Sequence, residues 1–169
     1  MRIIKLVIIA VVMLGGLVTL IGLLMPSRVM VARTVLIDAS PKQVFSTINQ
    51  LQTWHLWFGP LMNDTVDTVN PASGKLKWVT GGKENILLLK DTSAGFSHFI
   101  LTRKGQNPVN IFFSADSIEV VRSLQLEMRV VRDLKWYPWE KFSGMLEDHV
   151  TGPAYEATLK SLKAYIEKR

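Results

Sequence analysis

The chain has 169 residues, of which 48% are hydrophobic, and it contains no cysteine. This length suits one domain with a short appendage, and the lack of cysteine excludes a disulfide framework and thiolate chemistry. The net charge of +6 comes from basic residues spread along the chain. No basic helix, zinc-ligand spacing or aromatic RNA-binding strand accompanies that charge, so we expect no nucleic-acid partner.

Residues 1–26 predict a membrane anchor. The segment from Ile3 to Leu24 is almost purely apolar and matches the roughly 20 residues that cross a hydrocarbon core. A cleaved signal peptide is the alternative, but the apolar run is longer than usual and no small-residue cleavage site follows it. The short N-terminal tail and the long remainder, residues 27–169, favour a single-pass protein with an extracytoplasmic domain, which is periplasmic in a bacterium.

The first part of the domain predicts a strand and then a helix. Residues 29–38 are rich in β-branched side chains, which favour a strand. Ser40 is suited to the N-cap of a helix and Pro41 to its first position. Apolar residues then recur at helical spacing, and an aromatic segment at residues 51–60 follows.

Short strand-like runs separated by turn signals continue to about Leu134. Turns are expected at residues 81–83, 92–95 and 105–108, where glycine recurs. Such serial hairpins predict an antiparallel meander. Residues 123–131 alternate between apolar and polar side chains, which predicts a sheet with one buried face and one wet face.

The C-terminal third predicts helix with two apolar stripes. Gly152 and Pro153 separate the stripes and predict a break or kink. The first stripe contains Trp139, Phe142, Leu146 and Val150. The second stripe, wide enough to lie across a sheet, contains Tyr155, Leu159, Leu162 and Ile166.

Five segments, in this order, resemble the helix-grip superfamily. They are VARTVLI at 31–37, ASPKQVF at 39–45, WHLW at 54–57, GKLKW at 74–78 and YEATLKSLK at 155–163. That superfamily, called SRPBCC, includes the START lipid-transfer domains, the birch-pollen-allergen-like proteins and the polyketide cyclase/dehydrase group. The chain is most similar to bacterial members with an N-terminal membrane helix. The resemblance implies an α+β fold in which a curved antiparallel sheet wraps around a long C-terminal helix.

The resemblance also implies a cavity between the sheet and the last helix that takes lipids or other apolar molecules. We therefore expect a non-catalytic binding domain for a lipid or other apolar small molecule, with no metal and no cofactor. In that family the aromatic segment lies beside the cavity mouth. The residues expected to contact the ligand are Trp57, Phe58, Leu61, Trp78, His98, Leu126, Met128, Leu146 and Tyr155.

Two other functions remain open at this point. One is a cyclase, dehydratase or hydrolase that uses an inward polar residue, with His98 as the first choice and Asp116 as the second. The other is a protein-interaction module. The deciding observation is whether residues 155–166 lie over empty space or over packed side chains. The sequence predicts no particular oligomeric state.

Overall fold

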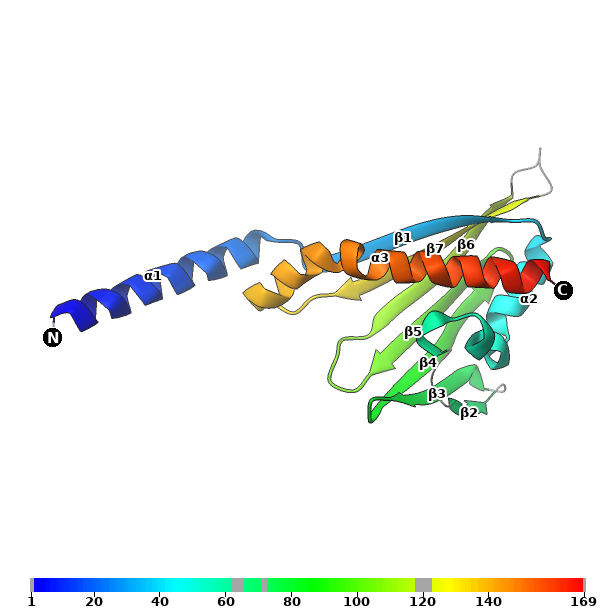
Figure 1. Ribbon diagram of the computed structural model, residues 1–169, viewed down its shortest axis with the longest axis horizontal. Helices are drawn as coiled ribbons and strands as arrows, with labels where there is room; N and C mark the ends of the chain where they lie inside the picture. Colours follow the sequence, from blue (N-terminus) through cyan, green and yellow to red (C-terminus); the bar gives the residue numbers. More distant parts are fainter. Residues whose placement is uncertain (1, 62–65, 71–72, 118–122, 169) are drawn as a thin grey trace.

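A computed structural model describes residues 2–61, 66–70, 73–117 and 123–168. A long helix lies at each end of the chain and the strands lie between them, as the sequence predicts (Figure 1). The elements are α1 (Arg2–Leu24), β1 (Arg28–Ile37), α2 (Pro41–Asn49), the 3₁₀ turns η1 (Leu51–Leu56) and η2 (Gly59–Leu61), β2 (Val66–Asn70), β3 (Lys75–Thr80), β4 (Lys83–Ser93), β5 (Phe96–Arg103), β6 (Val109–Ser117), β7 (Leu124–Asp133) and α3 (Pro138–Glu167).

In the described part of the chain, seven strands form one antiparallel sheet in the order β1-β7-β6-β5-β4-β3-β2. Strands β2 to β7 pair with their neighbours in sequence, which confirms the predicted meander. Gly81 and Gly82 turn the chain between β3 and β4 at φ values of 57° and 75°, which glycine adopts without steric cost. Strand β1 pairs with β7, with Arg28 opposite Asp133, so the chain enters the domain at the end of its last strand.

The helix α2 begins as its sequence predicts. Ser40 Oγ accepts a hydrogen bond from the N–H of Gln43 at 3.3 Å, and Pro41 occupies the start of the helix. Trp54 of η1 donates its Nε1–H to the carbonyl oxygen of Ile48 at 2.7 Å. The last carbonyl groups of a helix lack intrahelical donors, so this bond satisfies Ile48 and holds η1 against the end of α2.

The second half of α3 lies against the sheet, which curves around it (Figure 1). Leu159, Leu162 and Ile166 are buried there, which confirms that the second apolar stripe faces the sheet. The first stripe does not: its large apolar side chains are exposed to solvent in the structure. Burial of the second stripe supplies the stabilisation that holds the helix on the sheet, because helices in proteins gain most of their stability from packing.

The predicted break at Gly152 and Pro153 is wrong, because α3 runs through both residues. Gly152 is buried, and a Cβ there would lie 2.2 Å from Arg33 Nη2. The guanidinium of Arg33 crosses the helix at this point and pairs with Asp148 at 2.9 Å. Contacts of α3 with β1 on both sides of Pro153 therefore outweigh the loss of one backbone donor.

Aromatic side chains pack together in the core, on the face of the sheet that α3 covers. The ring centroid of Trp54 lies 4.8, 4.7 and 4.8 Å from those of Trp57, Phe58 and Phe99. All four side chains are buried. The expected empty space beneath residues 155–166 is thus largely occupied, because η1 and η2 fold the aromatic segment inward under the helix.

The helix α1 extends away from the domain (Figure 1). Its 23 residues are long and apolar enough to cross a membrane, and nearly all of its surface is exposed. The one buried residue is Gly22, where a Cβ would lie 3.0 Å from Pro138 Cα. The end of α1 therefore packs directly on the start of α3.

Candidate ligand-binding pocket

A pocket of about 290 Å³ remains between the sheet and the middle of α3. Its walls are strands β5, β6 and β7 on one side and one face of α3 on the other. Six of the lining residues are apolar and seven are polar or charged. Small-molecule sites likewise combine apolar walls with polar groups that orient the ligand. The lining residues are Phe58, Pro60, Leu101, Arg103, Gln106, Asn107, Val109, Ile111, Val130, Arg132, Glu147, Thr151 and Tyr155.

The pocket lies at the end of the sheet where the chain leaves α1. Arg132 stands opposite Val29, the second residue of β1, and opposite Val109 of β6. Leu101 of β5 stands opposite Val109 in turn. A row of pocket residues therefore crosses the sheet next to the first residues after the apolar helix.

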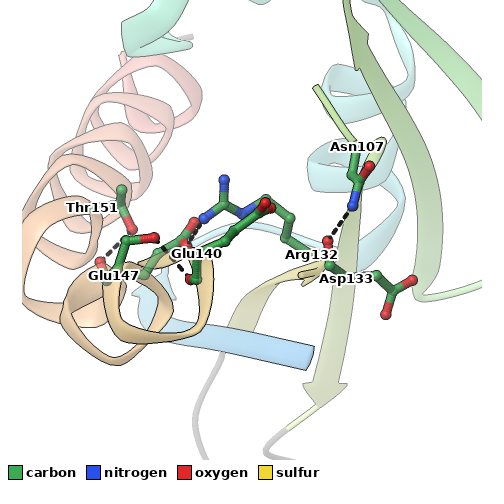
Figure 2. Close-up of polar contacts among 7 residues, drawn as sticks. Asn107, Arg132, Asp133, Glu140, Glu147 and Thr151 are labelled. Atoms are coloured by element: carbon green, nitrogen blue, oxygen red, sulfur yellow. Dashed lines mark hydrogen bonds and ion pairs between the residues drawn. The ribbon is translucent and has the colours of Figure 1, made fainter. Parts of the chain in front are cut away.

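An ion pair joins β7 to α3 at the pocket (Figure 2). Arg132 Nη2 donates to Glu147 Oε2, and the two side chains are only 26% and 14% exposed. Thr151 Oγ1 donates to the carbonyl oxygen of Glu147 at 2.8 Å. Nearby, Asn107 Nδ2 donates to the carbonyl oxygen of Asp133 at 2.8 Å. These bonds tie the helix, the β5–β6 turn and the end of β7 together around the pocket.

Two further polar groups contribute charge and hydrogen-bonding capacity. Burial raises the pKa of the Tyr155 phenol above 10.0, and a hydrogen bond with Thr151 offsets only part of that rise. The phenol therefore stays protonated near neutral pH. Arg103 donates its Nε–H to Asn85 Oδ1 at 2.7 Å, and no carboxylate of a described residue pairs with it. With Arg132 neutralised by Glu147, the charge of Arg103 leaves the pocket with a positive excess.

Three buried nitrogen atoms lack a hydrogen-bond partner among the described residues. They are Trp57 Nε1, Trp78 Nε1 and Arg132 Nε. Buried polar groups in proteins nearly always have a partner, so each such atom calls for an explanation. Arg132 lines the pocket, and its Nε–H has no partner among the protein atoms described.

The structure brings two of the nine predicted ligand contacts to the pocket. They are Phe58 and Tyr155, whose contact with a ligand stays a prediction. Five others are buried in the packed core instead of lining the pocket. These five are Trp57, Leu61, Trp78, Leu126 and Met128.

The other two predicted contacts point away from the interior. His98 lies on the outer face of β5, where its ring stacks on Phe112 at 4.3 Å and its Nε2 is 3.0 Å from Asn110 Oδ1. Its neighbours Ser97 and Phe99 take the inward positions, so strand alternation places His98 outside. Leu146 is 62% exposed on α3. Both assignments to the cavity are therefore wrong, and the enzymatic hypothesis loses its first-choice residue.

The charged residues of the pocket were missed by the sequence analysis, although a signal for them exists. Leu124, Leu126, Met128 and Val130 share the inward face of β7, and the same alternation places Arg132 on it. In β5 the inward positions 97, 99 and 101 lead to Arg103 in the same way. Continuing the inward–outward alternation to the end of each strand predicts that both arginines face inward.

The described residues contain no group of three or more histidine, aspartate or glutamate side chains that could hold a metal ion. Asp116, the second choice for a catalytic residue, lies in β6 opposite Gln125. The pocket's chemistry therefore depends on its arginines, Glu147 and Tyr155.

No family model matches the sequence, and no curated protein matches it. Solved structures, in contrast, match the fold. A START superfamily protein from Mycobacterium smegmatis has a TM-score of 0.61 at 16% identity, covering 83% of this chain and 98% of its own. The part of the chain after α1 has the START-like helix-grip fold.

Two other solved structures have the same fold. The Zhui aromatase/cyclase from Streptomyces sp. R1128 has a TM-score of 0.60 at 16% identity, covering 84% of this chain and 95% of its own. A solution structure from Thermobifida fusca has a TM-score of 0.60 at 13% identity, covering 82% of this chain and 93% of its own. At these identities the likeness establishes the START-like architecture, and the pocket residues must carry any argument about function.

Proposed function

We propose that this protein is a membrane-anchored domain that binds a small amphipathic molecule, with an apolar body and an anionic group, in the pocket beside Tyr155. The observation that supports this most directly is the pocket itself, a space of about 290 Å³ between the sheet and α3. Ligand pockets commonly measure about 300–1,000 Å³, so this one suits a small guest or part of a single acyl chain. The proposed ligand is therefore a small amphipathic molecule, a narrower class than the lipids in general that the sequence suggested.

The apolar part of the pocket accepts the body of the guest. Phe58, Ile111 and Val130 are buried, and Leu101 and Val109 pack against them at the edge of the core. Removing apolar surface from water stabilises a complex by about 25 cal/mol per Å² before the costs of association. A guest without apolar atoms would forgo this contribution.

The polar part of the pocket favours an anion at the other end of the guest. Arg103 has no carboxylate partner among the described residues, and Arg132 keeps a buried Nε–H. The protonated phenol of Tyr155 adds a neutral hydrogen-bond donor. Hydrogen bonds to charged groups contribute about 1.5–3 kcal/mol, which corresponds to roughly tenfold to 100-fold in Kd.

Membrane anchoring is the second part of the proposal. The helix α1 is exposed along nearly its whole length and has the length of a membrane span. We place the N-terminus inside and the domain on the extracytoplasmic side, which is the periplasm in a bacterium. Flotation of the full chain with liposomes at alkaline pH tests the anchoring, and protease protection in sealed vesicles tests the orientation.

A displacement assay on the full chain in detergent tests the binding. The probe is an environment-sensitive fluorescent fatty acid, and the competitors are a C10 carboxylic acid and its alcohol. We expect the acid to compete better than the alcohol, and Arg103→Met to remove that preference. Equal competition by both in the wild-type chain would contradict the anionic group.

A matched pair of variants tests the place of binding. Val109→Trp fills the pocket, whereas Val131→Trp adds the same volume on the outer face of the neighbouring strand. We expect probe binding to fall at least tenfold in Val109→Trp and to stay within twofold in Val131→Trp. The proposed pocket would be wrong if both variants, folded by circular dichroism, bound the probe as the wild type does.

A further inference from the structure

The first half of α3 presents an apolar surface that the domain does not cover. Trp139, Leu146 and Val150 are 70%, 62% and 73% exposed, and Phe142 lies between them on the same side of the helix. Met145 and the preceding Trp136 widen this surface, which we call the α3 stripe. Soluble proteins seldom expose so many large apolar side chains together, and such surfaces usually mark a site of association.

The α3 stripe begins where α1 ends, and the two helices are fixed to each other there. Gly22 of α1 packs on Pro138, and Lys141 Nζ donates to Ser27 Oγ and, at 3.5 Å, to the carbonyl oxygen of Met25. Lys141 is itself buried. The start of α3 therefore has a defined position relative to the apolar helix.

The apolar surface is continuous across this junction. A shallow apolar groove runs between the two helices, with Val11, Leu14 and Val18 on one side and Trp139 and Phe142 on the other. The groove includes Val18, which lies in the last two turns of α1, so a side chain that shares it lies near the end of the membrane span. Figure 1 shows the start of α3 beside the last turns of α1.

We propose that the α3 stripe is a membrane-contact surface, seated at the boundary between headgroups and acyl chains in the leaflet from which the domain emerges. This inference depends on the proposed anchoring by α1. Trp136, Tyr137 and Trp139 are residues that concentrate at this boundary, because their rings are apolar and carry a polar atom.

The contact also places the ligand pocket at the lipid surface. Glu147 and Thr151, which line the pocket, directly follow Leu146 and Val150 of the α3 stripe in sequence. Arg132 and Val109 lie at the end of the sheet nearest α1. A single-chain amphiphile in the leaflet would thus reach the pocket along α3, its charged end leading toward Arg103.

Tryptophan quenching by brominated phospholipids, with the full chain in nanodiscs, tests the contact. Trp54, Trp57 and Trp78 are fully buried in the core, so Trp136 and Trp139 are the indoles available to a lipid-borne quencher. We expect bromines near the headgroup end of the acyl chain to quench more strongly than bromines near its methyl end.

Matched variants show whether the stripe carries the contact. The double variant Leu146→Glu/Val150→Glu should reduce quenching at least twofold. The control Leu36→Glu/Leu88→Glu changes exposed residues on the outer face of the sheet and should leave quenching unchanged. Equal quenching in both double variants would overturn the role of the stripe.

The remaining outcomes separate this inference from the anchoring itself. A chain that fails to float with liposomes would overturn both, because the anchor would then be absent. A chain that floats with unquenched tryptophans would overturn the membrane contact alone. Native mass spectrometry could instead show a dimer that Leu146→Glu/Val150→Glu separates into monomers. Together with unquenched tryptophans, that result would assign the α3 stripe to a second copy of the chain and overturn the membrane contact.

Discussion

Trp54 and Trp57 offer a sharp test of how the interior is stabilised. Both side chains are fully buried in the same aromatic cluster, with ring centroids 4.8 Å apart. Trp54 Nε1 donates to Ile48 O at 2.7 Å, whereas Trp57 Nε1 has no partner among the described residues. Replacing either residue by phenylalanine removes the same atoms, so the two variants differ mainly in the hydrogen bond.

The expected difference follows from that bond. Trp54→Phe leaves a buried carbonyl unsatisfied, which costs about 1–3 kcal/mol, whereas Trp57→Phe removes a donor that is already unpaired. In a domain of this size 1 kcal/mol shifts Tm by about 2–4 °C, so Trp54→Phe should melt at least about 2 °C below Trp57→Phe.

Thermal unfolding of the full chain in detergent, followed by near-ultraviolet circular dichroism, measures the two values of Tm. Equal values, or a lower Tm for Trp57→Phe, would refute the reasoning. That result would mean that the indole of Trp57 is satisfied in solution, or that ring packing rather than hydrogen bonding dominates at these positions.

Three further predictions concern α3. In chemical unfolding, Gly144→Val should lower the free energy of unfolding by about 1–3 kcal/mol more than Ser143→Val. A Cβ at position 144 would lie 2.4 Å from Leu134 Cδ1, whereas Ser143 is exposed. The tyrosinate absorbance lost in Tyr155→Phe should titrate above pH 10. The free energy of unfolding keeps the full contribution of this group below pH 10 and loses it as pH rises through the raised pKa of Tyr155. A titration midpoint below 10 would contradict burial of the phenol. Lys141→Met should speed amide exchange at Leu134, whose N–H donates to the linker after α1, and unchanged exchange would show that Lys141 does not secure this junction.

Local signals in the sequence predict most of the secondary structure. The cap at Ser40, the glycine turns and the alternation in β7 each depend on a few adjacent residues, and each is found in the structure. The continuity of α3 through Pro153 was not predictable in this way. It depends on packing against β1, which lies more than 100 residues earlier in the chain.

The pocket was harder to predict than the fold. Trp57 and Trp78 are as apolar as any ligand contact, and only the inward folding of η1 decides that they fill the core. Trp139 and Leu146 have the spacing of a buried stripe, yet Gly144 and Glu147 take the positions of α3 that face the sheet. Helical periodicity identifies an apolar face without saying what covers it, whether protein or lipid.

The link between α1 and β1 limits the range over which this protein can act. Only Met25, Pro26 and Ser27 separate the two elements, and three residues extend at most about 11 Å. With α1 as the proposed membrane anchor, a tether that short would keep the domain on its own bilayer and prevent it from carrying a ligand to a second one. Any hand-over across a compartment would require a diffusible carrier or an opposing membrane protein that comes to meet it.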